Sequence, residues 1–123
     1  MSILGIGNDI LEISRMKKII EKHGLHFLCR LFSKEEQKYC SRLSDPSPCY
    51  AGKFAAKEAV VKALGTGFGK EVSWKDIEIL NKESGKPEAI LSKKTNEKFN
   101  NPKIHISISH SQSHATAIAI WED

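Results

Sequence analysis

Two carboxylates and one lysine stand among apolar neighbours, where charged side chains are uncommon. Glu58 and Lys62 lie four residues apart in the apolar stretch 54–64, so a helix over this stretch stacks them on one face. Asp9 lies in the apolar, glycine-containing stretch 3–10, which predicts a strand. Mg²⁺ is typically held by one or two carboxylates with waters and substrate phosphates, and a lysine attracts phosphate as a point charge. If Asp9 and Glu58 converge, the set predicts a Mg²⁺ site for phosphoryl chemistry.

Each of these residues also has a purely structural interpretation. Glu58 and Lys62 can form a partly buried ion pair that serves packing alone, and the local sequence supports both interpretations about equally. Asp9 can cap the helix that follows its strand, with Glu12 three residues later in the chain. The rest of the chain has to distinguish these alternatives.

Glycines follow the apolar helix at Gly65 and Gly67, where they allow the backbone to approach a ligand closely. This loop is not the phosphate-binding loop of P-loop nucleotide hydrolases, because the motif G-x-x-x-x-G-K-[ST] does not occur in the chain. His105, His110 and His114 lack a cysteine or aspartate that would complete a zinc site, so we do not expect zinc binding there.

The chain has 123 residues, of which 40% are hydrophobic and 28% charged, which is typical of a single globular domain over residues 1–123. No apolar run approaches the ~20 residues needed to cross a bilayer. The stretch 3–10 lacks the basic leader of a signal peptide, so we expect a cytoplasmic protein without a membrane partner. The three cysteines are an odd number without metal-type spacing, and we expect reduced structural thiols.

Hydrophobic periodicity predicts the elements that position these residues. A capping box of Ser33 and Glu36 predicts the start of one helix. The expected helices cover residues 12–23 (ended by Gly24), 33–41, 49–64 and 93–99. The expected strands cover residues 3–9, 76–80 and 88–91, and a closing hairpin formed by 104–109 and 115–120. The sum is an α+β fold, a single domain with a mainly antiparallel sheet packed around a long buried central helix.

Basic residues are concentrated between Arg15 and Arg42, where eight basic and three acidic side chains give +5 within a chain of net charge +4. Arg15, Lys18 and Lys22 recur at helical spacing on one face. A basic face favours an acidic partner, such as nucleic acid, an anionic cofactor or an acidic protein. A nucleic-acid-binding module is disfavoured because few aromatic residues lie near this face and no binding motif is present. A structural oligomeric domain without a site is the third alternative.

Several segments resemble the motifs of the holo-[acyl-carrier-protein] synthase family, the small single-domain group of the 4′-phosphopantetheinyl transferases. The resemblance covers essentially the whole chain, and the motifs occur in the order found in the family. Lys57-Glu58, the downstream Lys62 and Asp9 form its most specific combination. The matching segments are Gly5-Ile6-Gly7-Asn8-Asp9-Ile10, Ala51 to Ala59, Lys62 to Gly67, Gly85-Lys86-Pro87 and His105 to His110.

The resemblance implies a Mg²⁺-dependent transferase of fatty acid biosynthesis. The family moves the 4′-phosphopantetheine group of coenzyme A to a serine of apo acyl carrier protein and releases adenosine 3′,5′-bisphosphate. By resemblance, Asp9 and Glu58 bind Mg²⁺ at the coenzyme A pyrophosphate, and Lys62 contacts the phosphates. Glu58, or a metal-bound water near it, is the candidate base for the carrier serine.

The resemblance also implies the surfaces that bind the two substrates. Arg15, Lys18 and Lys22 would dock the acidic carrier protein, which accounts for the charge asymmetry. The family works as a homotrimer with its sites between subunits. Lys53 stands where the family usually has arginine, so it would meet a phosphate without the bidentate fork. The residues expected at coenzyme A are Lys53, Lys62, Gly65, Gly67, Pro87, His105 and Ser109.

Overall fold

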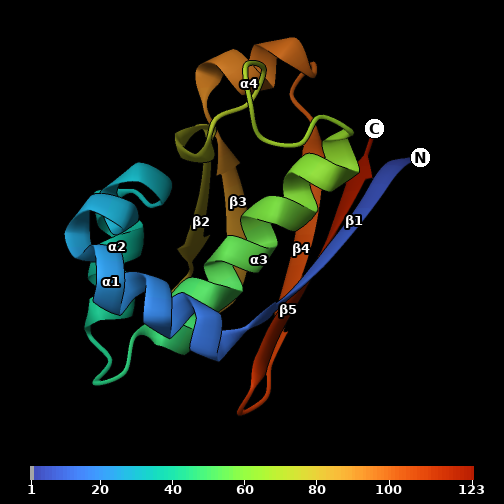
Figure 1. The fold of residues 1–123 in the computed structure, drawn as a ribbon. Helices are drawn as coiled ribbons and strands as arrows, with labels where there is room; N and C mark the ends of the chain where they lie inside the picture. Colours follow the sequence, from blue (N-terminus) through green and yellow to red (C-terminus); the bar gives the residue numbers. More distant parts are fainter. Residues whose placement is uncertain (1) are drawn as a thin grey trace.

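The computed structural model describes residues 2–123, and Met1 lies outside the described part. Figure 1 shows the arrangement of its helices and strands. No helix within residues 2–123 is long and apolar enough to cross a membrane. The helices are α1 (Ile13–Leu31), α2 (Lys34–Ser41), α3 (Ser47–Leu64), the 3₁₀ helix η1 (Trp74–Asp76) and α4 (Lys93–Lys98). The strands are β1 (Ile3–Glu12), β2 (Ile77–Asn81), β3 (Pro87–Leu91), β4 (Lys103–His110) and β5 (His114–Glu122).

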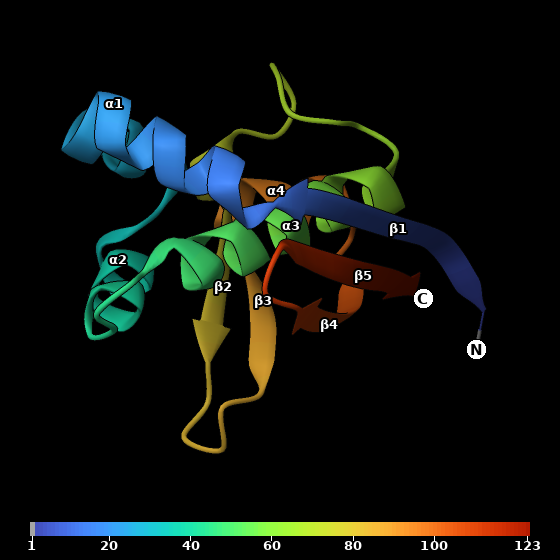
Figure 2. The ribbon, with the colours of Figure 1, turned by 60° about the horizontal axis from the view of Figure 1, so that its bottom comes forward.

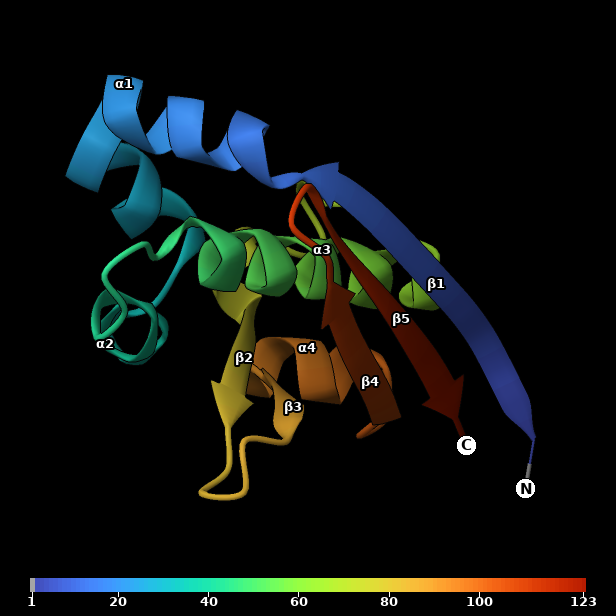
Figure 3. The ribbon, with the colours of Figure 1, turned by 90° about the horizontal axis from the view of Figure 1, so that it is seen from below.

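The strands form two antiparallel sheets, where a single sheet was expected. One sheet has the order β1-β5-β4, and the other pairs β2 with β3. The expected closing hairpin is confirmed, because β4 and β5 are paired along their length from His110 opposite Ala115. β3 lies beside β4, so the two sheets together surround much of α3 (Figures 1 and 3). The α+β class with antiparallel strands around a central helix is confirmed.

α3 is the buried centre of the fold and contacts strands of both sheets (Figure 2). Its small side chains allow the strands to approach closely, and Ala59 is fully buried. β1 contributes to this approach with Gly7, since a Cβ atom added there would lie 1.9 Å from the carbonyl oxygen of Ala59. Side chains alternate along a strand, so Asp9, two residues beyond Gly7, faces α3 as well.

The first helix departs from the expectation at Gly24, where it was predicted to end. Gly24 has φ +57° and ψ −138°, and the chain resumes helical structure beyond it as far as Leu31. A positive φ costs glycine little, so this residue changes the direction of the helix rather than ending it. β1 also continues beyond Asp9 to Glu12, and Glu12 at the N-cap makes no side-chain cap hydrogen bond. Asp9 is therefore a strand residue and not a helix cap.

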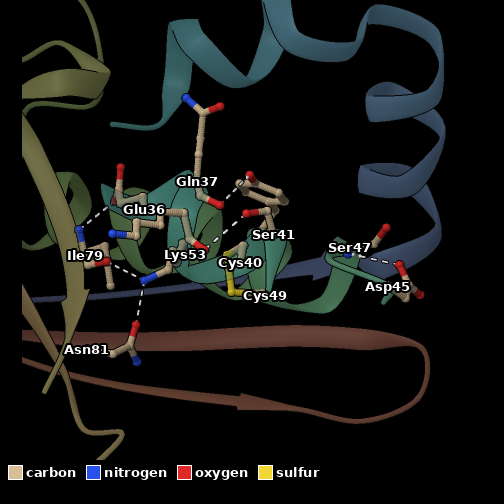
Figure 4. Close-up of a disulfide and its surroundings, with 12 residues drawn as sticks. Glu36, Gln37, Cys40, Ser41, Asp45, Ser47, Cys49, Lys53, Ile79 and Asn81 are labelled. Carbon is tan, nitrogen blue, oxygen red and sulfur yellow. Dashed lines mark hydrogen bonds between the residues drawn. A yellow bond between two sulfur atoms is a disulfide. The ribbon is translucent and has the colours of Figure 1, made fainter. Parts of the chain in front are cut away.

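α2 is fastened to its neighbours at both ends. Its first turn has the expected capping box, in which Ser33 Oγ accepts from the backbone of Glu36 and Glu36 Oε1 accepts from the backbone of Ser33. A disulfide joins Cys40 near its end to Cys49 in the first turn of α3 (Figure 4). The expectation of reduced thiols is therefore wrong for this pair, while Cys29 is free and exposed. The loop between α2 and α3 brings the pair together, which spacing alone does not reveal.

Candidate active site

Asp9, Glu58 and Lys62 meet where β1 crosses α3. Lys62 Nζ lies 3.2 Å from Asp9 Oδ1 and donates a second hydrogen bond, 2.9 Å long, to the carbonyl oxygen of Asn8. Helical spacing favoured a pair between Lys62 and Glu58. Instead, Lys62 binds the carboxylate of Asp9 and the neighbouring carbonyl group, both on β1. The Lys62 side chain is half exposed, so the ion pair contributes at most ~1 kcal/mol and leaves the ammonium free to turn toward a ligand.

Glu58 is the partly buried carboxylate of this set. Burial raises the pKa of Glu58 above its ordinary value, the negative charge of Asp9 raises it further, and Lys62 opposes the shift. The charge of Asp9 therefore disfavours ionisation of Glu58. A raised pKa also brings a carboxylate closer to the range in which it accepts and returns a proton at neutral pH.

The chemistry of Asp9 and Glu58 fits Mg²⁺. Two carboxylates that repel each other form a hard, negative oxygen set, and Mg²⁺ is typically held by one or two carboxylates plus waters and phosphates. Within residues 2–123, no group of three or more His, Cys, Asp or Glu side chains is arranged to hold a metal ion. At two carboxylates, the rest of a Mg²⁺ shell would consist of waters and substrate phosphate oxygens, as is usual in phosphoryl transfer.

Both carboxylates border a cavity of about 580 Å³ between β1, α1, α3 and η1. Arg15 and Arg30 of α1 lie at its edge and make this approach positive. The indole ring of Trp74 stacks on Phe54, with the ring centroids 5.0 Å apart. The apolar residues of the wall are Ile10, Leu11, Met16, Ile19, Phe27, Leu31, Phe54 and Trp74.

The predicted basic face lies on the first half of α1. Arg15, Lys18 and Lys22 are all exposed there, and Figure 3 shows α1 extending away from the end of β1. Of the three, only Arg15 lines the cavity of Asp9 and Glu58. The basic face therefore begins at the candidate site and continues away from it.

Lys53 and Pro87 line a separate cavity of about 240 Å³. The Lys53 side chain is nearly fully buried and donates hydrogen bonds to the carbonyl oxygen of Ile79 and, at 2.7 Å, to Asn81 Oδ1 (Figure 4). Burial lowers the pKa of Lys53 to about 8, and the charge of Glu36 opposes this shift. The Lys53 ammonium, which was expected to bind a phosphate, therefore donates hydrogen bonds to β2.

Gly65 and Gly67 form the loop that ends α3, with φ of +80° and +63°. These values explain why glycine occupies both positions. Between them, Thr66 Oγ1 is buried and has no hydrogen-bond partner within residues 2–123. Because buried hydroxyls are normally satisfied, this oxygen marks the loop as a candidate contact for a ligand.

His105 and Ser109 lie on β4, on the face of the three-stranded sheet that is turned away from α3. Ser109 borders a shallow cavity with Asn8 of β1. His105 Nε2 lies 3.4 Å from Glu122 Oε1. A single chain therefore does not bring these two residues to the carboxylates on the opposite face.

A buried ion pair lies beside Glu58 in the chain and was not foreseen. Lys57 Nζ is 2.9 Å from Glu36 Oε1, and both side chains are fully buried. The sequence offered one signal, a lysine within a run of alanines, but Glu36 was already accounted for by its capping box. No local pattern joins two residues that lie 21 positions apart.

Known proteins of one family are similar to this chain along nearly its whole length. A family model described as the 4′-phosphopantetheinyl transferase superfamily matches residues 5–119. The chain is 54% identical over 118 residues to the holo-[acyl-carrier-protein] synthase of Protochlamydia amoebophila, covering 96% of this chain and 97% of that protein. The crystal structure of Helicobacter pylori holo-[acyl-carrier-protein] synthase in complex with coenzyme A is similar with a TM-score of 0.88 and 38% identity, covering 95% and 99% of the chains. The enzyme of Neisseria meningitidis is similar with a TM-score of 0.90 and 31% identity, covering 99% and 100%.

Proposed function

Because the chain belongs to the 4′-phosphopantetheinyl transferase superfamily, we propose that Asp9, Glu58 and Lys62 form the centre at which it transfers 4′-phosphopantetheine from coenzyme A to a serine of apo acyl carrier protein. The convergence of these three residues where β1 crosses α3 carries the proposal. The products are holo carrier protein, for fatty acid biosynthesis, and adenosine 3′,5′-bisphosphate. We treat residues 1–123 as one catalytic domain, which the match to residues 5–119 supports.

In the proposed reaction, the serine oxygen forms a bond to the phosphorus that bears the pantetheine arm. The bond from that phosphorus to the bridging oxygen of the pyrophosphate breaks, and the leaving phosphate takes the electron pair. Glu58, with its raised pKa, accepts the serine proton directly or through one water. Lys62 turns from Asp9 toward the phosphate oxygens, where its charge stabilises the developing negative charge. Mg²⁺ held by Asp9 and Glu58 would supply further positive charge to the pyrophosphate.

The proposal extends to the coenzyme A contacts. The glycine loop contributes a closely approachable backbone and the unpartnered hydroxyl of Thr66. The remaining contacts lie in another cavity or on the opposite sheet face, so a second subunit is needed to bring such groups to one ligand. The residues that we assign to coenzyme A are Lys53, Lys62, Gly65, Gly67, Pro87, His105 and Ser109.

A homotrimer with its sites between subunits meets this need. The uncovered face of the three-stranded sheet exposes Ile6 by 61%, Ile10 by 67% and Ile118 by 42%. An exposed apolar patch of this kind favours association with another protein surface. Light scattering should give three times the chain mass, and Ile6→Lys should lower it, while a monomeric, fully active wild type would contradict this arrangement.

We assign Arg15, Lys18 and Lys22 to docking of the acidic carrier protein. Reversing the charges of Arg15 and Lys18 should raise the KM for carrier protein by about tenfold, since exposed charge pairs contribute up to ~1 kcal/mol each. The KM for coenzyme A should stay within about twofold, and the difference should grow at low salt because screening weakens. Equal effects on both substrates would argue against docking at this face.

The central test mixes the protein with coenzyme A, Mg²⁺ and apo acyl carrier protein, and measures the carrier by mass spectrometry. We expect the carrier to gain the mass of the phosphopantetheine arm, and chelation of Mg²⁺ to stop the gain until Mg²⁺ is restored. Glu58→Gln and Asp9→Asn should abolish transfer while the circular dichroism spectrum stays unchanged. Glu97→Gln on the exposed surface of α4 is the matched control and should remain active. No mass gain with verified substrates would refute the function.

A further inference from the structure

The pair of Lys57 and Glu36 is a fully buried charge pair that the proposed reaction does not use. Burial lowers the pKa of Lys57, and the charge and hydrogen bond of Glu36 oppose that shift. A buried ammonium is costly unless it is paired and hydrogen-bonded. The groups that satisfy it belong to three other elements of the fold.

All three donors of the Lys57 ammonium are used. They reach Glu36 Oε1 at 2.9 Å, the carbonyl oxygen of Leu31 at 2.7 Å and the carbonyl oxygen of Trp74 at 3.2 Å. Leu31 is the last residue of α1, and Trp74 is the first residue of η1. We call Lys57, Glu36 and these two carbonyl groups the Lys57 clamp. It ties α3 to one end of each of three other elements.

Glu36 extends the connection further. Its Oε1 also accepts the backbone hydrogen bond of Ser33 at 2.8 Å. Its Oε2 accepts the backbone hydrogen bond of Ile79 in β2 at 2.7 Å, as Figure 4 shows. The carboxylate is thus held from three sides and cannot follow the lysine if the lysine moves. The clamp is a fixed point rather than a flexible surface pair.

The residues held by the clamp form a wall of the candidate site. Leu31 and Trp74 both line the cavity that contains Asp9 and Glu58. The indole of Trp74 also stacks on Phe68, with the ring centroids 3.8 Å apart, so the wall extends to the loop beyond α3. Consecutive helix residues point about 100° apart, so α3 directs Glu58 into the cavity and the preceding lysine to the groups behind its wall.

We propose that Lys57 is a positioning residue, which with Glu36 fixes the wall formed by Leu31 and Trp74 at the distance from Glu58 that the carrier serine and the pantetheine arm require. Lys57 touches neither substrate, and it acts on the rate through the shape of the cavity. The effect on the transfer rate rests on the proposed function, but the position of the wall can be measured even in a protein without transferase activity.

A purely structural role makes a different prediction. Removing one partner of a buried ion pair strands a charge and is strongly destabilising, whereas removing both is often nearly neutral. Lys57→Met alone should therefore be less stable than the wild type, and Glu36→Gln with Lys57→Met should recover the part of the loss that comes from the stranded charge. The carbonyl groups of Leu31 and Trp74 stay unpaired in both variants. If the pair serves stability alone, activity should recover with it. If it positions the wall, activity should stay low in the double variant.

The experiment measures urea midpoints, kcat and the KM for each substrate in these two variants. We expect the double variant to be more stable than Lys57→Met but to keep a kcat at least tenfold below the wild type, with the KM for coenzyme A within twofold. Lys98→Met, which removes a lysine from an exposed pair with Glu71, is the control and should keep the wild-type kcat. Recovery of kcat together with stability would overturn the inference.

Two further measurements keep the test decisive if the double variant folds poorly. Acrylamide quenching of Trp74, in a Trp121→Phe background, should be stronger in Lys57→Arg than in the parent, because the planar guanidinium cannot reproduce three convergent ammonium contacts. Unchanged quenching would refute the clamp even if the protein proved inactive as a transferase. Trp74→Ala, which trims the wall and keeps the clamp, should lose at least tenfold in kcat, and an unchanged kcat would refute the role of the wall. An inactive wild type, by contrast, would refute the proposed function itself.

Discussion

Gly7→Ala tests whether the close contact between β1 and α3 positions the carboxylate of Asp9. An ideal Cβ on Gly7 would lie 1.9 Å from the carbonyl oxygen of Ala59 and 2.7 Å from the backbone nitrogen of Ala63. Cβ atoms essentially never approach other heavy atoms more closely than 3.0 Å. One of the two backbones must therefore move by about 1 Å, because both clashing atoms are main-chain atoms that no rotamer change can remove.

The expected loss in the free energy of unfolding follows from the rigidity of this contact between β1 and α3. Ala59 is fully buried in the middle of α3, so the strand has to yield, and overpacking of this kind costs ~1–3 kcal/mol or more. We expect a loss of about 3 kcal/mol in the free energy of unfolding. For a chain of this length, that corresponds to a fall in Tm of about 10 °C. Asp9 follows two residues later, and a displacement of about 1 Å in a reacting group can reduce the rate by about 100-fold.

The assay combines urea unfolding with the mass-based transfer assay. Gly69→Ala is the matched control, since no heavy atom lies within 4 Å of its added Cβ, and it should stay within ~1 kcal/mol of the wild type. Gly52→Ala should fall between the two, because its Cβ meets a side-chain atom, Ile108 Cγ2 at 3.0 Å, rather than the main chain. If Gly7→Ala matched Gly69→Ala in stability and kept full activity, the strand contact would not position Asp9.

Two further predictions concern the disulfide and the Glu58 carboxyl. The disulfide between α2 and α3 closes a loop of about ten residues, for which chain entropy gives about 3 kcal/mol, so Cys49→Ser should lose that amount in oxidised protein and Cys29→Ser should lose nothing. Dithiothreitol should abolish the difference, and a difference that persists would contradict the loop-closure explanation. In a carbon-13 NMR titration, Asp9→Asn should lower the pKa of Glu58 and Lys62→Met should raise it; shifts of the opposite sign would contradict the assigned electrostatics. Because the folded protein holds the Glu58 proton more tightly than the unfolded chain, this residue should lower stability as the pH rises from 4.5 through its folded pKa.

Most of the secondary structure could be predicted because it is determined by neighbours in the sequence. The capping box of Ser33 and Glu36 and the alternation along β4 and β5 are signals of this kind. Gly24 is different, because a glycine after a helical run allows either a stop or a kink. Here Leu31 is buried in the same hydrophobic cluster as Met16, so tertiary packing favours a second helical segment after the kink. The residues next to Gly24 in the sequence do not show this tertiary contact, so they cannot distinguish a kink from a stop.

The convergence of the two carboxylates and Lys62 could be predicted from the sequence, but the pairing among them could not. Asp9, Glu58 and Lys62 converge as expected, yet the partner of Lys62 depends on where β1 crosses α3, and that crossing depends on the missing side chain of Gly7. Lys53 shows the same limit, since its engagement with β2 follows from the depth at which α3 is buried. The spacing of charged residues along one helix predicts which side chains share a face. It does not predict which strand packs against that face.

The adjacent residues Lys57 and Glu58 give α3 two functions on neighbouring faces. Glu58 enters the cavity as a partly buried carboxylate with a raised pKa, and Lys57 is fully buried behind the cavity wall. The two positions should therefore fail in different ways. Glu58→Gln removes the group that we propose accepts the proton while the wall stays in place, so substrate KM values should change less than kcat. Loss of the Lys57 ammonium keeps the carboxylate but releases Leu31 and Trp74, so the geometry in which the serine meets Glu58 is no longer fixed. The helix that they share explains why a clamp lysine can stand next to the proposed catalytic carboxylate, because consecutive positions point about 100° apart and a shift of one position would turn either side chain away from its partners.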